Sequence, residues 1–266
     1  MNILIVAPRG KQAGLATLAA ANREDVKIVG AVAPKGRDYI GMDVGEVSPI
    51  GRKVGAKVYG DIEEIIDECD AIVDFSTIES SLAVLEAARS HGKAYVCGTT
   101  GFSDEQKNKF AEASKDIPVM LTANTSKLVN VLYKMLEMTA RSVGKDTDIE
   151  IVDMHDNHKL DAPSGTAREI GNAIGRGLGK NIDEIAEYGH CGEDPRTDGS
   201  VVFHSIRGGD WPSSHTVYFI GNGERLELTH HSLNWKCFGE GAVDAAIFLC
   251  GQKPGQYTMA DVLGLN

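Results

Sequence analysis

A short segment of this chain gathers titratable side chains: MHDNHKLDAPSGTA holds two histidines, two aspartates and a lysine. An imidazole titrates near neutral pH, so His155 is the natural candidate for a proton donor. Lys159 follows four residues later and can place a full positive charge beside an anion. A proton donor next to an anion-binding group is typical of an enzyme that protonates an atom that becomes basic, such as a carbon or nitrogen receiving a hydride.

The end of the same segment predicts the start of a helix. Ser164 is a good N-cap residue, and Pro163 fixes the approach of the chain to it. Gly165 and Thr166 would then form the first helical turn, whose free N–H groups and dipole favour an anion. Together with Lys159, this turn predicts a pocket for a carboxylate or phosphate group on a small substrate.

Metal binding and structural roles are the alternatives for the polar residues around this turn. The spacing of the first cluster fits no standard zinc pattern, and two further pairs lack a complementary pair at ligand spacing. We therefore expect no metal at Asp153, His155, Asp156, His158, His190, Cys191, His230 or His231. His158 is interpreted as a hydrogen-bonded histidine of the core or behind the site, and Asp161 as a cap for local backbone.

A glycine-containing turn between a strand and a helix lies near Met1, where a dinucleotide-binding fold places its phosphate loop. The turn has the sequence APRGKQAG, which keeps only Gly10 and Gly14 of the expected G-x-G-x-x-G. Arg9 and Lys11 can meet phosphate oxygens, and the start of the following helix favours an anion. An ordinary surface turn is the alternative interpretation.

The end of the second predicted strand bears on which dinucleotide would bind. The acidic residue that usually holds the ribose hydroxyls is missing, because Ala33 and Pro34 stand there. Lys35 and Arg37 lie just beyond. The missing acid and the nearby bases favour NADPH slightly over NADH.

A second loop ends a later strand of the same half of the chain. Thr99 and Thr100 stand there between Gly98 and Gly101. The glycines allow a ligand to approach the backbone closely, and the hydroxyls can hydrogen-bond to it. Taken alone, however, such a tetrapeptide is more often a turn than a site.

Two patterns of elements would position these residues. Up to residue 126, short apolar strands alternate with helical segments, one of them IEEIIDECD, which indicates a Rossmann-like, doubly wound parallel sheet. From residue 127 on, strands joined by Gly-rich turns predict a separate α+β domain with a mixed or antiparallel sheet. The last helix, GEGAVDAAIFLC, returns to the first domain. We expect a dinucleotide-binding domain of residues 1–126 and 237–266 and a substrate-binding domain of residues 127–236.

The composition limits the classes of function. The chain has 266 residues, of which 42% are hydrophobic and 24% charged, which is ordinary for a globular protein. Its net charge of −11 argues against nucleic acid or an anionic membrane surface as a partner. Five scattered cysteines without a CxxC pair indicate reduced thiols, and no apolar run is long enough for a membrane helix. A cytoplasmic location is expected.

The segment from residue 155 to 167 resembles the signature of the dihydrodipicolinate reductase family, which serves lysine and diaminopimelate synthesis. That signature is a histidine pair, then HK, then DAPSGTA. The likeness extends over nearly the whole chain, through VDFS, GTTGF, ANTS, TDIEIVD, RGGD, ERLELTHH, FGEGAV and a tail with DVLGLN. It implies a homotetrameric reductase whose second domain also makes the oligomer, and which passes hydride from NADPH or NADH to a cyclic dicarboxylate.

The resemblance also implies roles for single residues. His155 matches the family's proton donor, and Lys159 matches its partner at the substrate. Gly165 and Thr166 match contacts to a substrate carboxylate, and Asp156 stands where the family has a second, substrate-contacting histidine. The cofactor contacts match Ala7, Pro8, Arg9, Gly10, Lys11, Gln12, Gly98, Thr99, Thr100, Thr122, Ala123, Asn124 and Thr125, with Lys35 as a further candidate.

Four residues depart from the family pattern. Asp156 puts a negative side chain beside a dicarboxylate, which is unfavourable by roughly 1 to 4 kcal/mol at contact distance. Thr125 stands where an aromatic residue is usual, Trp235 where an arginine is, and Lys127 where a small apolar residue is. Two other hypotheses stay open: a paralogue that reduces a related cyclic imine acid, and a ligand-binding protein that has lost the nucleotide.

Overall fold

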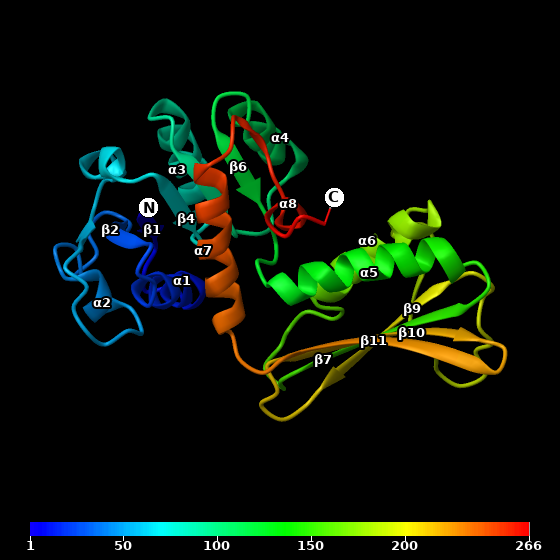
Figure 1. The fold of residues 1–266 in the computed structure, drawn as a ribbon. Coiled ribbons are helices and arrows are strands. Elements are labelled where there is room, and N and C mark those ends of the chain that lie inside the picture. Colours follow the sequence, from blue (N-terminus) through cyan, green and yellow to red (C-terminus); the bar gives the residue numbers. More distant parts are fainter. Residues whose placement is uncertain (266) are drawn as a thin grey trace. The chain divides into compact units, whose positions relative to one another are not determined.

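The chain folds into two compact units in the computed structural model, which describes residues 1–265 (Figure 1). Asn266, the end of the DVLGLN tail, lies outside the described residues. The first unit contains residues 1–127 and the chain from Trp235 on, and the second is Leu128–Asn234. The second unit is therefore an insertion into the first.

The first unit is built on a parallel sheet with the strand order β12-β6-β5-β4-β1-β2-β3. Its strands are β1 (Asn2–Val6), β2 (Lys27–Val32), β3 (Lys57–Tyr59), β4 (Ala71–Asp74), β5 (Ala94–Cys97), β6 (Pro118–Leu121) and β12 (Gly255–Gln256). The order reverses beside β1, because β2 lies on one side of it and β4 on the other. The Rossmann-like, doubly wound sheet predicted from the strand–helix alternation is confirmed.

Helices pack on both faces of this sheet because its strands are buried on both sides. Ile3 and Ile5 of β1 belong to a core with α1 (Lys11–Ala21) and α7 (Lys236–Cys250). Leu4, between them, faces a second core with α3 (Ile78–Ser90) and α4 (Asp104–Ala113). The short helices α2 (Val44–Val47) and α8 (Met259–Val262) complete the unit.

The segment IEEIIDECD does not form the predicted helix. It forms two single turns of 3-10 helix, η1 (Ile62–Glu64) and η2 (Ile66–Glu68). Acidic residues four apart, such as Glu63 and Asp67, would repel each other along a continuous helix. The adjacent Ile65 and Ile66 are both buried, which suits a tight irregular turn better than a helix with one buried side.

The second unit contains a mixed sheet with the order β11-β10-β7-β9-β8. Its strands are β7 (Asp148–His155), β8 (Ala186–Tyr188), β9 (Val201–Arg207), β10 (Ser213–Gly221) and β11 (Glu224–Ser232). β7 pairs antiparallel with β10 and parallel with β9. The predicted α+β architecture is confirmed, and of its two expected sheet types the mixed one is found.

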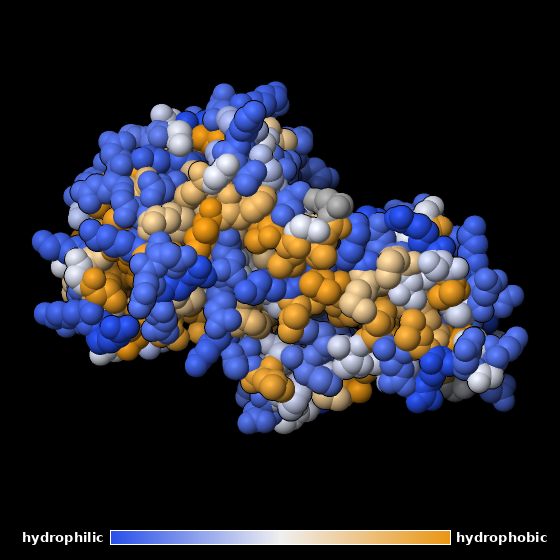
Figure 2. All heavy atoms as spheres, in the orientation of Figure 1, coloured by the Kyte–Doolittle hydropathy of each residue, from blue (hydrophilic) through white to orange (hydrophobic). Residues whose placement is uncertain are grey.

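Two helices, α5 (Lys127–Val143) and α6 (Gly165–Leu178), cover one face of this sheet (Figure 1). Buried residues of both helices join Ile149 and Ile151 of β7 in one core, and the one-turn η3 (Ile182–Glu184) follows α6. Apolar atoms also gather on the outward side of α5 (Figure 2), where Leu128, Met135 and Met138 are exposed. Within residues 1–265, no helix has the length and apolar character that crossing a bilayer requires.

Candidate active site

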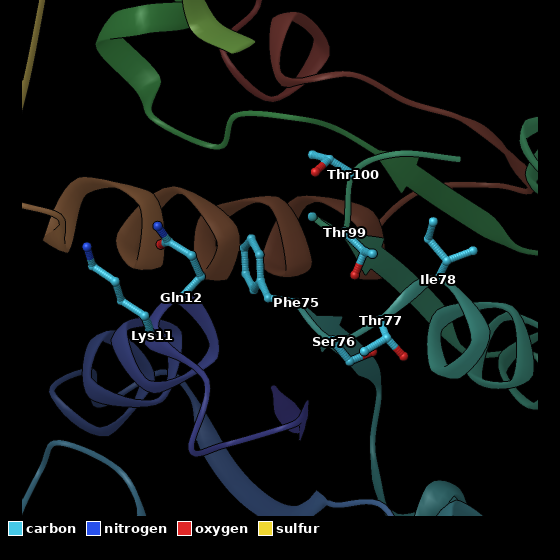
Figure 3. Close-up of a pocket in the computed structure, with 9 residues that line it drawn as sticks. Lys11, Gln12, Phe75, Ser76, Thr77, Ile78, Thr99 and Thr100 are labelled. Carbon is cyan, nitrogen blue, oxygen red and sulfur yellow. The ribbon is translucent and has the colours of Figure 1, made fainter. Parts of the chain in front are cut away.

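A cavity of about 460 Å³ lies where three loops of the first unit meet (Figure 3). The loops follow β1, β4 and β5, so they stand together at the carboxyl ends of neighbouring strands. That edge is where doubly wound sheets bind their ligands. The cavity is lined by Lys11, Gln12, Phe75, Ser76, Thr77, Ile78, Gly98, Thr99 and Thr100.

The loop after β5 can reach this cavity only because Gly98 has no side chain. A Cβ atom at this position would lie 2.0 Å from the ring of Phe75. Thr99 is fixed by a hydrogen bond of 2.9 Å from the Ser81 hydroxyl, while Thr100 is exposed at the mouth. The close approach expected for a ligand-binding loop is thus built into this turn.

A buried carboxylate holds the loop after β4. Asp74 is fully buried at the end of that strand and accepts the Ser76 N–H at 2.8 Å and the Tyr95 hydroxyl at 2.6 Å. Burial, together with the negative charge of Asp74, raises the pKa of Tyr95 far above its usual value, so the phenol keeps its proton. The Asp74 carboxylate therefore holds the loop from Phe75 to Ile78 in place.

The loop after β1 leaves several polar groups ready for a ligand. Ala7 adopts a φ of +58°, a conformation that a glycine usually supplies, and Pro8 behind it is buried. Gly10 is the N-cap of α1 and provides no side-chain cap, so the first N–H groups of the helix remain available. Gln12 Oε1 is buried without a hydrogen-bond partner among residues 1–265. These features fit a bound phosphate-containing cofactor.

The three expected cations of this region all have partners within the first unit. The Arg9 guanidinium stacks over the Tyr39 ring and lies 3.2 Å from Asp38. Lys35 pairs with Asp61 at 2.9 Å. Lys11 lines the cavity, and its ammonium group lies 3.8 Å from the centre of the Trp235 ring. Of these three side chains, only Lys11 points into the cavity region.

The loop after β6 does not line this cavity. Within it, the Thr122 hydroxyl donates to the Asn124 carbonyl, and Ala123 lies between them. Thr125 is buried and donates its hydroxyl to the Phe238 carbonyl at 2.6 Å. Their polar groups hold the loop against the start of α7, which leaves a direct cofactor contact of residues 122–125 as a prediction.

The predicted proton donor, His155, ends β7 in the second unit. Its side chain is only 5% exposed, and Nδ1 lies 2.8 Å from Oδ1 of the fully buried Asp153. Residues two apart on a strand point to the same face, so both face the side covered by helices. The carboxylate therefore orients the imidazole ring.

Asp153 joins His155 to the neighbouring strands and to α6. Its other oxygen accepts the Ser164 N–H at 2.8 Å and an Arg207 N–H at 3.1 Å. His215 stands opposite Asp153 in the β7–β10 register, and its Nε2 lies 3.4 Å from Oδ1. Burial alone would raise the pKa of the Asp153 carboxyl, but its two histidine neighbours and the amide outweigh burial, so the pKa lies far below its usual value.

His215 is almost fully buried beside this carboxylate. Burial lowers its pKa, and the contact with Asp153 opposes that shift only in part. Its ring lies edge-on to His155, with 5.3 Å between the centroids, and its Nε2 is 3.1 Å from the Ser164 hydroxyl. His215 thus links His155 to the N-cap of α6.

The start of α6 has the predicted form. Ser164 is the N-cap, and its hydroxyl accepts the Ala167 N–H at 3.1 Å. Gly165 is exposed, and a Cβ atom there would meet nothing within 4 Å. Thr166 follows in the first turn, which contains no acidic side chain. An anion can therefore reach the first N–H groups of α6.

Lys159 and Asp161 form an ion pair beside this helix start. The hydrogen bond from Lys159 is the largest cause that lowers the pKa of the Asp161 carboxyl, with burial opposing it and the Gly165 N–H assisting it. Arg207 donates to the Asp161 carbonyl at 2.6 Å. Asp161 thus pairs with the lysine that is expected at the substrate, and its capping of local backbone stays a prediction.

The two remaining polar residues of the segment shape its turn. Asp156 accepts the backbone N–H of His158 at 2.8 Å, which leaves a substrate contact of its carboxylate as a prediction. His158 is exposed, so its interpretation as a histidine of the core or behind the site is wrong. The chain turns outward after β7, and even the apolar Leu160, two residues after His158, is 97% exposed.

Two groups in the second unit have the composition of metal ligands. Asp153, His155 and His215 form one, and Glu150, His190 and His204 form the other. Arg196 donates to Glu150, which gives that carboxylate a permanent positive partner. The sequence does not suggest the second group, because its members come from two strands and a loop.

Sequence reasoning missed several of the residues that surround these sites. The segment from Phe75 to Ile78, which lines the cavity, directly follows the buried strand β4. Its place after a predicted strand was the signal that it lies at the ligand-binding edge of the sheet. Asp153 lies two residues before His155, so strand periodicity could have paired them. Arg207 and His215 become neighbours only through the strand order of the mixed sheet.

Family profiles match both parts of the chain. The one described as dihydrodipicolinate reductase, N-terminus, covers residues 1–125, and the one described as the C-terminus covers residues 128–263. The chain is 43% identical to the 4-hydroxy-tetrahydrodipicolinate reductase of Acinetobacter baumannii (strain AYE) over 258 residues, 97% of this chain and 94% of the relative. It is 40% identical to the enzyme of the same name from Hahella chejuensis, over 99% of both chains.

Solved structures share the fold. A dipicolinate-bound dihydrodipicolinate reductase from Paenisporosarcina sp. TG-14 superposes with a TM-score of 0.74, at 21% identity and 97% coverage of both chains. An amine dehydrogenase from Mycobacterium smegmatis gives a TM-score of 0.65 at 14% identity, over 97% of this chain and 94% of that one. The two-unit architecture thus occurs in dehydrogenases of different name.

Proposed function

Because the chain belongs to the dihydrodipicolinate reductase family, we propose that its first unit holds the nicotinamide cofactor and its second unit holds and protonates the substrate. The protein is an NAD(P)H-dependent oxidoreductase of lysine and diaminopimelate synthesis, and its substrate is a cyclic dicarboxylate. Cofactor binding, substrate binding and proton transfer each fall to a separate group of residues in this chain.

The cofactor would lie along the cavity at the carboxyl ends of β1, β4 and β5. The N–H groups that begin α1, with Lys11 beside them, would hold its phosphates. Gln12, whose buried Oε1 lacks a partner among residues 1–265, and the Gly98–Thr100 turn would contact the rest. When bound, NADH or NADPH supplies the hydride.

NADPH is the slightly favoured cofactor. No acid stands at Ala33 or Pro34, just after β2, where a ribose-binding carboxylate would select NADH. Arg9 and Lys35 follow β1 and β2, and both can turn from their exposed ion pairs to a 2′-phosphate, since such pairs contribute little.

In the second unit, Lys159 and the first turn of α6 would hold one substrate carboxylate. His155 would then give its proton to the ring atom that becomes basic. Asp153 acts through His155 as a positioning residue, because its contact with Nδ1 fixes the orientation of the imidazole. The observation that carries this assignment is the pairing of His155 with a buried carboxylate that also binds the N-cap of α6.

The decisive experiment measures cofactor oxidation with dihydrodipicolinate generated in situ, with NADPH and NADH in parallel. Turnover with a lower KM for NADPH is the expected result. Related cyclic imino acids form the comparison arm, because Asp156 and Trp235 depart from the family pattern. Faster turnover of one of those acids would contradict the substrate assignment, and failure of both cofactors to bind below millimolar concentration would contradict the whole proposal.

Self-association into a homotetramer is proposed through the face of the second sheet that α5 and α6 leave uncovered. Ile206 and Ile220 are 45% and 38% exposed there, on the face opposite the helix-covered core. An uncovered apolar sheet face in a cytoplasmic protein, the location we propose, favours contact with another copy. Light scattering at several concentrations measures the oligomer directly.

A further inference from the structure

The proposed anion pocket already contains a carboxylate from the chain itself. Lys159 donates to Asp161, and the Gly165 N–H at the start of α6 contributes to the low pKa of the same carboxyl. These are the two groups that the proposed function assigns to a substrate carboxylate. Asp161 therefore occupies the lysine that the substrate would require, and it does so beside the helix start that would bind the same anion.

Several contacts keep Asp161 in this position. Its backbone carbonyl accepts a hydrogen bond from Arg207 at 2.6 Å, and Arg207 is in turn held by the buried Asp153. The Lys159 side chain is 28% exposed, so its ammonium group gains from an anionic partner more than a fully solvated lysine would. The Asp161 side chain is 54% exposed, which leaves it free to move out towards water.

We propose that Asp161 is an internal occupant of the anion pocket, which a substrate carboxylate must displace before it binds. The inference rests on the proposed function of Lys159 and α6. Displacement conserves charge in the pocket, because one carboxylate replaces another on the same lysine. Asp161 then sets the affinity of this pocket for every anion.

The energetic consequence depends on the population of the open pocket. The apparent dissociation constant of a ligand rises by the inverse of the fraction of molecules that are ready to bind it. Since Asp161 closes the pocket to all anions alike, it weakens the binding of the substrate and of other anions by one common factor. Single-point anions such as phosphate then stay unbound at millimolar levels, while a dicarboxylate with further contacts still binds.

The test is the D161N variant, which keeps the shape of the side chain and removes its charge. We expect KM for the dicarboxylate substrate to fall about 3- to 10-fold with little change in kcat, because an ion pair of this exposure is worth on the order of 1 kcal/mol. The dissociation constant of dipicolinate and the inhibition constant of inorganic phosphate are expected to fall by the same factor. Titration calorimetry and steady-state kinetics give these values.

D210N is the matched control, because Asp210 is an exposed carboxylate in the loop whose Gly209 carbonyl accepts the Asn157 N–H. It removes the same charge nearby without touching Lys159, and a change of less than about 2-fold is expected. Equal shifts in D161N and D210N would show a general charge effect and overturn the inference. An unchanged or higher KM in D161N would overturn it as well.

Two further variants separate this inference from the proposed function. D161S serves if D161N fails to fold, with the same expected direction. K159A tests the pocket itself: wild-type dipicolinate binding in K159A would refute the proposed site. If K159A loses binding while D161N gains none, the pocket stands and the internal occupant alone is refuted.

Discussion

At the scale of single residues, the site depends on a chain of contacts that begins at one buried carboxylate. Asp153 touches the imidazole of His155, the backbone of Ser164 and the guanidinium of Arg207. The proposed proton donor, the start of α6 and the end of β9 are therefore held by one group. A change at Asp153 is expected to alter chemistry and binding together.

His155→Ala is expected to lower kcat about 10²- to 10⁴-fold, the usual contribution of a positioned general acid. Substrate affinity changes little, because the anion pocket stays intact. Steady-state kinetics with the preferred nicotinamide measures both. His91→Ala, at an exposed histidine between Asp67 and Glu63, is the control and should keep wild-type turnover. Wild-type kcat in His155→Ala would refute its role.

Asp153→Asn is expected to lower kcat and to raise KM together. The amide has one acceptor oxygen, so it cannot serve both His155 and the Ser164 N–H as the carboxylate does. A role in stability alone would lower the melting temperature and leave both constants of the folded enzyme unchanged. Steady-state kinetics and thermal unfolding of the variant and the wild type distinguish the two cases.

How far the site could be predicted depends on how local each signal is. His155, Lys159 and the Ser164 cap lie within ten residues of one another, so composition and capping rules suffice. The partners of His155 on β9 and β10 required the strand order, which nothing in the sequence of β7 specifies. The exposure of His158 was missed because the outward turn after β7 depends on backbone contacts with Gly209.

At the scale of elements, β7 and α6 together position the reactive groups. β7 is the central strand of its sheet, so the strands β10 and β9 on its two sides fix the position of His155. α6 begins ten residues after the end of β7, and the N–H of its N-cap residue hydrogen-bonds back to Asp153 on β7. The distance between the proposed proton donor and the proposed anion pocket is thus set by a strand–helix junction and one hydrogen bond.

Ser164→Ala is expected to destabilise the protein by about 0.5–2 kcal/mol through loss of the N-cap. KM is expected to rise too, because the first turn of α6 frays where the anion binds. Ser103→Ala is a matched control, since Ser103 caps α4 in the first unit and forms a capping box with Gln106. It should cost similar stability, measured by urea unfolding, with KM unchanged. Equal KM values for the two variants would contradict the role of the α6 turn.

The helices and strands, too, could be predicted where nearby residues specify them, and could not where distant parts of the chain do. Alternating strands and helices define the first sheet because its crossovers through α1, α3 and α4 each contain a helix of full length. The second sheet is mixed because β9 runs parallel to β7 after a long excursion through α6, and sequence alone leaves that direction open. IEEIIDECD was misassigned because its apolar spacing suits a helix while its acidic residues oppose one.

At the scale of the whole molecule, buried histidines couple folding to pH. His215 and His230 both have pKa values below the usual one, chiefly because burial disfavours their charged forms. The unfolded chain takes up these protons near pH 6.5 while the folded chain does not. The free energy of unfolding therefore decreases as the pH falls. His91 acts in the opposite direction, since its acidic partners raise its pKa, but it lies at the surface.

The melting temperature is therefore expected to be highest above about pH 7 and to fall as the pH drops from 7 towards 5. The stability that each buried histidine contributes is complete above its pKa in the unfolded chain. This stability is lost as the pH falls towards its pKa in the folded protein. His230→Gln removes one of the two groups and should flatten this dependence. Differential scanning calorimetry across the range tests it, and an unchanged slope in the variant would contradict the assignment.

The order of segments in the first unit determines when that unit can be completed during synthesis. α7 packs against α1 and β4, yet residues 128–234 leave the ribosome before it. At about 5–20 residues per second, this interval lasts on the order of ten seconds. Until α7 is made, one side of β4 remains exposed to solvent. In the folded protein, this side packs in the same core as Ala242 and Ala246 of α7. The core of the first unit can thus close only after the whole second unit has been translated.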